Sequence, residues 1–258
     1  MKLLSFLPYS LHFKSIDSTQ NFLKRKYKKL FNLTFVFSDF QTEGRGRHGR
    51  KWVSANSANL LFSFLIKNPK LVKRFDSLSI FIAVTLKELL TNFGLDNVEI
   101  KWPNDVYVNS KKIAGILLEG INEGSKIKAL VIGVGLNVNQ DEFNDDLRVP
   151  ATSLKLELDK EVSIKTLRKE TYKLFYKNIK NIDSVDYLKI ANDSNFLKNK
   201  YVSFEYNGET VFGEAKEINK DNSLTIIKDN DIIKVKSGEV NNVKIDKWLK
   251  FVSLEILI

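Results

Sequence analysis

The chain has 258 residues, of which 43% are hydrophobic and 28% are charged, a balance typical of an ordinary soluble globular protein. No stretch approaches the roughly 18 apolar residues that a membrane-spanning helix needs. The absence of cysteine excludes disulfides and thiolate metal sites and fits a cytoplasmic protein. The net charge of +10 rests on 34 lysines and seven arginines. Because the lysines are spread along the whole chain, they are typical of a solvated surface, although their charge favours an acidic partner.

The first third of the chain predicts helices and strands in alternation. Ser18 is a typical helix cap, and the apolar spacing after it predicts an amphipathic helix to about residue 29. Residues 33–40 and 59–66 are apolar, β-rich runs. Residues 77–93 are apolar almost all round and end at Gly94, which predicts a buried helix with a glycine cap.

The middle of the chain predicts a meander of strands through VEIKW, VYVNS and IAGILLE. In the next apolar run, Gly133 and Gly135 indicate a bulge or a close approach of the backbone to a ligand. Residues 163–182 have the pattern of another amphipathic helix.

From Tyr201 onward the pattern changes to short strands with sharp turns. The Asn207-Gly208 pair is a strong hairpin signal, and closely spaced short strands predict a small barrel. We therefore expect two domains, residues 1–195 and 196–258.

The segment EGRGRHGRKW, residues 43–52, concentrates three of the seven arginines and three of the twelve glycines between two predicted strands. Guanidinium groups on a bendable backbone with free N–H groups suit phosphate or carboxylate. A glycine-rich surface loop with solvated charges is the alternative interpretation. The spacing matches neither of the standard nucleotide-binding loops.

The segment KWPNDVYVNSKK places Lys101 and Lys112 on adjacent strands of a predicted hairpin, so that both could point into one pocket. Asp105 would be a lone carboxylate among cations there, suited to a ribose hydroxyl, a magnesium ion or a lysine partner. Taken alone, Pro103-Asn104-Asp105 reads as a plain turn.

Together, GRGRHGRKW, KWPNDVYVNSKKIAGILLE and VIGVGLNVN resemble the biotin–protein ligases in order and spacing. Ser18-Thr19-Gln20, ATSL at 151–154 and VFGEAKEI through SGEV agree with the resemblance, which runs from about residue 15 to residue 245. It implies an α+β catalytic domain related to class II aminoacyl-tRNA synthetases, followed by a small SH3-like barrel. Because the motifs begin near the first residue, we expect the monofunctional type, without an N-terminal DNA-binding domain. The tail 246–258 extends past the last matched motif.

The resemblance implies a biotin–[acetyl-CoA-carboxylase] ligase. Such enzymes use ATP to convert biotin to biotinyl-5'-AMP, with release of pyrophosphate, and then transfer biotin to a lysine of a biotin carboxyl carrier protein. Biotin and ATP are then substrates, and Mg²⁺ is expected with ATP. We expect neither a specific nucleic acid nor a membrane as partner, and a homodimer stays open.

The resemblance also implies individual site residues. The expected biotin-binding residues are Ser18, Thr19, Gln20, Gln41, Gly44, Arg45, Gly46, Arg47, Lys112 and Gly115. The expected ATP-binding residues are Arg47, Arg50, Trp52, Lys101, Asn104, Asp105 and Asn137. The expected catalytic residues are Arg47, Lys101 and Lys112. Two plainer readings stay open, because Ser18 could be only a helix cap and Trp52 only part of the core.

Two other functions are weighed against this one. A lipoate or octanoate ligase or transferase shares the fold, but the paired motifs GRGRHGRKW and KWPND favour biotin. A DNA-binding regulator that merely senses biotin is suggested by the net charge and weakened by the dispersed lysines.

Overall fold

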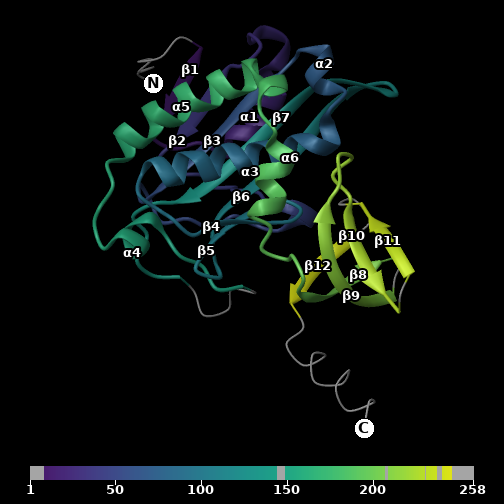
Figure 1. Ribbon diagram of the computed structural model, residues 1–258. Helices are drawn as coiled ribbons and strands as arrows, with labels where there is room; N and C mark the ends of the chain where they lie inside the picture. Colours follow the sequence, from purple (N-terminus) through teal and green to yellow (C-terminus); the bar gives the residue numbers. More distant parts are fainter. Residues whose placement is uncertain (1–8, 144–148, 207–208, 230, 237–239, 246–258) are drawn as a thin grey trace.

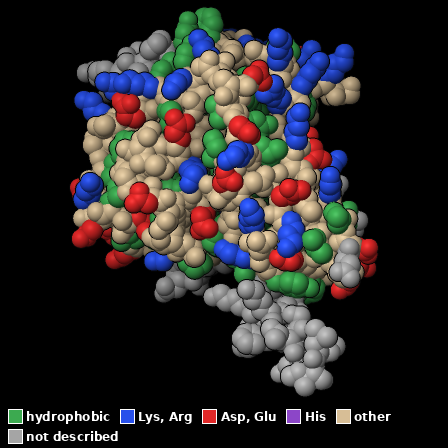
Figure 2. Space-filling model, in the orientation of Figure 1, with side chains coloured by type: hydrophobic (Ala, Val, Ile, Leu, Met, Phe, Trp, Pro, Cys, Tyr) green, Lys and Arg blue, Asp and Glu red, His purple; other side chains and the backbone are tan. Residues whose placement is uncertain are grey.

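The computed structural model describes residues 9–143, 149–206, 209–229, 231–236 and 240–245 (Figure 1). The Asn207-Gly208 pair and the tail 246–258 therefore lie outside the described residues. Over the visible face, Lys and Arg side chains are scattered among acidic ones, as the dispersed lysines of the sequence predict (Figure 2). In the described part of the chain, no helix is both long enough and apolar enough to cross a bilayer.

The main body is built on a seven-stranded mixed sheet in the order β1-β2-β3-β7-β6-β5-β4. Only the β1–β2 pair is parallel among the neighbours described. This sheet, with its helices, confirms the expected α+β class. The strands are β1 (Ser10–Phe13), β2 (Phe35–Ser38), β3 (Asn59–Ile66), β4 (Val98–Lys101), β5 (Asp105–Val108), β6 (Lys111–Glu123) and β7 (Lys126–Asn137).

One face of this sheet holds the large core. Helices α3 (Phe75–Asn92) and α5 (Ile164–Lys180) cross it, with α6 (Tyr187–Asp193) beside them (Figure 1). Phe62 of β3 meets Phe175 of α5 edge to face, with ring centroids 5.3 Å apart. Such edge-to-face packing adds to the free energy gained by burying the rings. This face is therefore filled by helices.

The opposite face carries less cover. Helix α1 (Thr19–Lys26), extended by a short 3-10 turn (η1, Tyr27–Lys29), packs Leu23 against Leu65 of β3 and Val131 of β7. Beyond the helix N-terminus, this face of the sheet carries Gly115 of β6 and Gly133 and Gly135 of β7 in place of large apolar side chains. This half-covered face is where the predicted site residues gather. Two further short helices, α2 (Pro69–Val72) and α4 (Leu154–Leu158), lie in connections.

The C-terminal strands form a separate five-stranded antiparallel sheet in the order β11-β10-β9-β8-β12. It lies beside the main sheet, next to α6 and the turn after β4 (Figure 1). The Trp102 indole N–H donates to the Asn222 carbonyl at 2.9 Å, and Asn192 of α6 exchanges two hydrogen bonds with the Ile218 backbone. The strands are β8 (Tyr201–Tyr206), β9 (Glu209–Ile218), β10 (Leu224–Lys228), β11 (Asp231–Val235) and β12 (Val240–Ile245).

Candidate active site

The floor of the site is made by glycines on the two longest strands. Gly115 of β6 lies opposite Gly135 of β7 in the register. A Cβ at Gly135 would lie 2.3 Å from the Trp52 indole, and one at Gly133 would lie 2.6 Å from the Gln20 side chain. Only glycine therefore lets these two side chains lie directly on the sheet. Protein side chains are the groups that approach these glycines closely, and the approach of a ligand stays a prediction.

The Arg/Gly segment is a small hairpin. The Gly46 N–H donates to the Arg50 carbonyl at 2.7 Å, and the Trp52 N–H donates to the Gly44 carbonyl at 3.0 Å. A 3-10 turn (η2, Arg47–Gly49) forms its tip. A Cβ at Gly44 would lie 2.3 Å from the Trp52 carbonyl oxygen, so glycine is required at the base. Backbone hydrogen bonds thus hold the arginines in fixed directions.

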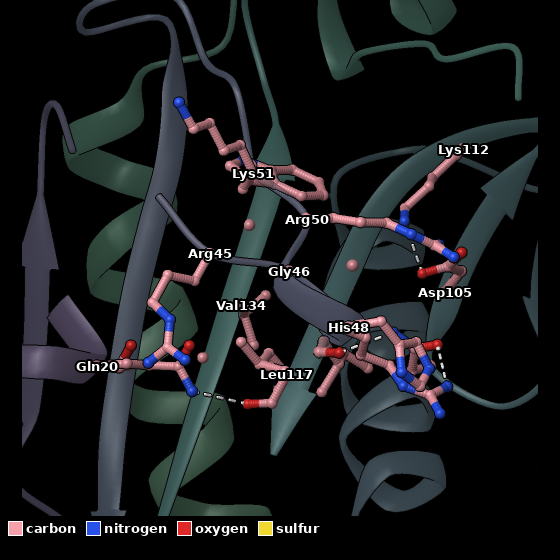
Figure 3. A pocket seen from close by; sticks show the side chains of 18 of the residues that line it. Gln20, Arg45, Gly46, His48, Arg50, Lys51, Asp105, Lys112, Leu117 and Val134 are labelled. Atoms are coloured by element: carbon pink, nitrogen blue, oxygen red, sulfur yellow. Dashed lines mark hydrogen bonds and ion pairs between the residues drawn. The ribbon is translucent and has the colours of Figure 1, made fainter. Parts of the chain in front are cut away.

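The hairpin, α1 and the strand ends enclose a cavity of about 230 Å³ (Figure 3). It brings together residues that lie far apart in the sequence. The predicted site residues that line it are Ser18, Thr19, Gln20, Gln41, Arg45, Gly46, Arg47, Arg50, Trp52, Lys101, Asn104, Asp105, Lys112 and Gly115.

Gly44 and Asn137 are not among the cavity-lining residues. Gly44 is buried under Trp52 at the base of the hairpin. The Asn137 side-chain amide donates to the Thr152 carbonyl at 3.0 Å, and Asn137 is only 5% exposed. In this structure Asn137 therefore joins the end of β7 to the ATSL segment, and its assignment to adenine stays a prediction.

One end of the cavity is lined mainly by neutral polar groups, beside Arg45, whose charge is paired with Glu119 (Figure 3). The Thr19 N–H and hydroxyl both donate to Gln41 Oε1, at 2.7 and 3.0 Å, and the hydroxyls of Thr19 and Ser63 lie 2.7 Å apart. Gln20 Nε2 donates to the Leu117 carbonyl at 3.1 Å (Figure 3). This end can exchange neutral hydrogen bonds with a polar ring.

Ser18 is both a helix cap and a cavity-lining residue, and its contact with biotin stays a prediction. Its hydroxyl accepts from the Asn21 N–H at 3.4 Å as the cap of α1, and it also lines the cavity. Ser63 is a lining residue that the sequence analysis missed. The one sequence feature that could have indicated Ser63 is that it is the only hydroxyl residue inside the apolar run NLLFSFLI.

The other end of the cavity is cationic. Lys112 Nζ lies 2.7 Å from Asp105 Oδ1 (Figure 3). Lys101 Nζ lies 3.3 Å from the Tyr107 hydroxyl. Both lysines line the one cavity, as the predicted hairpin requires. Arg47 reaches the same end, where its Nη1 donates to Asn104 Oδ1 at 3.2 Å.

Burial lowers the pKa of Lys101, and the Asp105 carboxylate opposes that shift while Lys112 adds to it. Burial also lowers the pKa of Arg47, and Asp105 again opposes it. A guanidinium stays protonated at any physiological pH. Half-buried cations that outnumber the single lining carboxylate give this end a strong preference for anions.

Trp52 lies between the two ends. Its indole covers Gly115 and Gly135, and the Lys112 ammonium lies 5.5 Å from its ring centroid. Its indole nitrogen is buried without a hydrogen-bond partner among the described residues. Trp52 is therefore a cavity wall between the polar and the cationic ends, and not merely part of the core.

Comparison with known proteins gives this arrangement a context. The Biotin/lipoate A/B protein ligase family matches residues 12–137. The chain is 35% identical over 132 residues to the bifunctional ligase/repressor BirA of Salmonella typhimurium, covering 51% of this chain and 41% of that protein. It is 33% identical over 127 residues to the biotin–[acetyl-CoA-carboxylase] ligase of Paracoccus denitrificans, covering 47% of this chain and 51% of that one. The chain thus spans about half or less of these relatives' length.

The structural likeness extends further along the chain. A biotin protein ligase from Aquifex aeolicus, solved in complex with biotin and ATP, superimposes with a TM-score of 0.81. It is 27% identical and covers 93% of this chain and 100% of that one. The family match at residues 12–137 includes α1, the Arg/Gly hairpin and the glycine floor. Residues 12–137 of this chain therefore match the biotin/lipoate A/B protein ligase family, and the chain is similar to biotin protein ligases in sequence and in fold.

Proposed function

We propose that this chain is a cytoplasmic, ATP-dependent biotin–[acetyl-CoA-carboxylase] ligase. A biotin carboxylate oxygen attacks the α-phosphorus of ATP, and the bond to pyrophosphate breaks, which leaves biotinyl-5'-AMP. The amine of a lysine on a biotin carboxyl carrier protein then attacks the acyl carbon, and AMP leaves. The observation that carries this proposal is one cavity with a neutral hydrogen-bonding end, a cationic end and an aromatic wall between them.

The neutral end suits the ureido ring of biotin, which offers one carbonyl acceptor and two N–H donors. Thr19, Gln20 and Gln41 supply amide and hydroxyl groups there, and Ser63 adds a second hydroxyl. The carboxylate of biotin would then extend past Trp52 toward Lys112 and Arg47. In this arrangement the protein positions two anions and offsets their repulsion.

The cationic end suits the phosphates. Lys101, Asn104 and Asp105 would line the ATP side, and Trp52 would pack against the adenylate. Asp105 is the only carboxylate among the lining residues described, and no group of three His, Asp or Glu side chains that could hold a metal occurs in the described ranges. Mg²⁺ that holds phosphates with few protein ligands fits such a site, so we treat it as part of the MgATP substrate.

The five-stranded sheet is proposed to be the SH3-like barrel of a second domain, residues 196–258. Its strands are short and antiparallel, and the Trp102–Asn222 hydrogen bond joins it to the turn that carries Asn104 and Asp105. Through this contact the second domain would position the ATP side of the cavity. The acceptor protein, and a homodimer as the assembly, are inferences from the resemblance.

A substrate panel tests the choice between biotin and the related acids. Labelled biotin, lipoate and octanoate are each offered with ATP and the matching purified carrier domain. We expect ATP-dependent labelling with biotin alone. Labelling with lipoate or octanoate but not with biotin would establish the alternative function.

Lys101→Ala should raise the requirement for ATP and slow pyrophosphate release, with biotin affinity little changed. The reason is that Lys101 lies at the cationic end, away from the Thr19–Gln41 end. Chemically made biotinyl-5'-AMP bypasses the first step, so it should restore carrier labelling by this variant. Lys70→Ala, an exposed lysine far from the cavity lining, is the control. Equal loss of labelling with and without supplied adenylate would contradict the assignment.

Trp102→Phe should raise the Michaelis constant for ATP more than that for biotin, and lower the melting temperature. The substitution removes the indole N–H and leaves the buried Asn222 carbonyl without its donor, a loss of about 1–3 kcal/mol. Asn222→Gly keeps that carbonyl and tolerates the φ of 62° at this position, but it removes the side-chain hydrogen bond to Ser79, so it controls for loss of that second contact. Equal changes in both Michaelis constants would argue against the positioning role.

A further inference from the structure

Arg45 is held by Glu119, the last residue of the segment KWPNDVYVNSKKIAGILLE, to which the sequence analysis assigned no role. Its Nη2 lies 3.1 Å from Glu119 Oε1, and its Nη1 lies 3.3 Å from Glu119 Oε2. The same Nη1 donates to Asn21 Oδ1 of α1 at 3.1 Å. Both carboxylate oxygens face the guanidinium, which is the arrangement that gives arginine–carboxylate pairs their directional character.

Glu119 occupies a fixed place on the site's own floor. It lies on β6 two residues beyond Leu117, so the side chains of Glu119 and Leu117 point to the same face of the sheet. The Leu117 carbonyl accepts the hydrogen bond from Gln20 described above. The Glu119 side chain is 18% exposed, and Lys24 of α1 lies 2.5 Å from its Oε1. Glu119 thus joins the floor strand, α1 and the hairpin.

Arg45 is at the base of the hairpin, where its backbone bridges to Lys51. Arg47 follows two residues later and reaches Asn104 across the cavity. Trp52 follows Lys51 and covers the glycine floor. A constraint on the Arg45 side chain therefore sets the direction in which the whole hairpin leaves the sheet.

We propose that Glu119 is a positioning residue that anchors the hairpin of residues 44–52 over the cavity through Arg45, and so slows ligand release. That the released ligand is biotinyl-5'-AMP rests on the proposed function, whereas the anchoring of the hairpin by Glu119 does not. Because the Arg45 side chain is 40% exposed, the ion pair is open to screening by salt. The anchor is accordingly strong at low ionic strength and weak at high ionic strength.

Limited trypsin digestion of the full chain without ligand tests the anchor directly. The hairpin offers Arg45, Arg47, Arg50 and Lys51 as cleavage sites. We expect Glu119→Ala to be cut there several-fold faster than the parent chain at low salt. Glu119→Gln, which keeps the shape and one acceptor but loses the charge, should fall between the two.

Two controls separate an anchor from a general structural role. Glu123→Ala removes a carboxylate on the same strand that pairs with the exposed Lys28. Lys24→Met removes the other partner of Glu119 and leaves the Arg45 pair in place. Both should leave hairpin cleavage unchanged. Acceleration of hairpin cleavage by Lys24→Met to the level of Glu119→Ala would overturn the proposal.

Release of biotinyl-5'-AMP supplies the functional readout. Release from Glu119→Ala should be several-fold faster than from the parent chain at low salt, and the difference should close near ~1 M salt, where the Debye length is about 3 Å. The double variant Arg45→Ala with Glu119→Ala should release the adenylate little faster than Arg45→Ala alone, because Glu119 acts through Arg45. Unchanged cleavage and unchanged release in Glu119→Ala would overturn the proposal. A parent chain that binds neither biotin nor the adenylate would contradict the proposed function, and the digestion result would still decide the anchor.

Discussion

Arg47→Ala should reduce the rate of adenylate formation by ~10²–10³, the loss typical when one positioned donor is removed from developing charge. Arg47 lies in the tip turn of the hairpin and reaches into the cationic end, where its Nη1 meets Asn104. Its charge faces the position proposed for the biotin carboxylate and the α-phosphate. The side chain does not belong to either hydrophobic core cluster, so the fold should survive.

Single-turnover release of pyrophosphate measures this effect, and thermal unfolding checks the fold. Arg74→Ala is the control, since Arg74 is an arginine outside the cavity that pairs with the exposed Asp183. A rate for Arg47→Ala within threefold of the parent chain would remove Arg47 from the catalytic residues.

Lys112→Ala should have the second large effect, a loss of ~10² or more in adenylate formation together with faster loss of the bound adenylate. The substitution removes a cation from the anion-binding end. It also leaves the Asp105 carboxylate, 2.7 Å away in the parent chain, without its partner beside the phosphates. The repulsion that Asp105 then exerts adds to the loss.

Retention of biotinyl-5'-AMP on gel filtration, with pyrophosphate release, measures both parts. Lys111→Ala is the matched control, because Lys111 is the neighbouring residue on β6 and is exposed. Adding Asp105→Asn to Lys112→Ala should restore part of the adenylate retention, since it removes the unpaired charge. Loss in Lys112→Ala no greater than in Lys111→Ala would contradict the role.

The sequence predicted the strands and long helices well where the hydrophobic pattern is local. The run at 59–66 appears as β3 with the same bounds, and the run at 77–93 appears as α3 with small shifts at its ends. The short elements β1 and α6 were not predicted. The four residues of β1 owe their strand form to parallel pairing with β2, a partner more than twenty residues away. Such elements depend on tertiary contacts with residues that lie outside any short window of the sequence.

The site was predicted from motifs, and its geometry was not. The concentration of arginine and glycine indicated an anion-binding loop, but nothing local revealed that Gly46 and Arg50 would pair as a hairpin. Ser63 and Glu119 were missed because each gains its meaning only from side chains that the fold brings near, Thr19 for one and Arg45 for the other. The residue types of a motif and their spacing predict the chemistry of a site. Which side chains contact one another follows from the register of the sheet.

We propose that one cavity joins biotin to the α-phosphate of ATP before any acceptor protein is present. The most direct measurement mixes the protein with biotin and MgATP, without a carrier protein, and identifies the bound product by mass spectrometry. We expect biotinyl-5'-AMP in about a one-to-one ratio to protein, with an equal amount of pyrophosphate. Adding a carrier domain should convert all of this adenylate to AMP and labelled carrier. Biotin bound unchanged in the presence of MgATP, or carrier labelling that needs no ATP, would contradict the proposal.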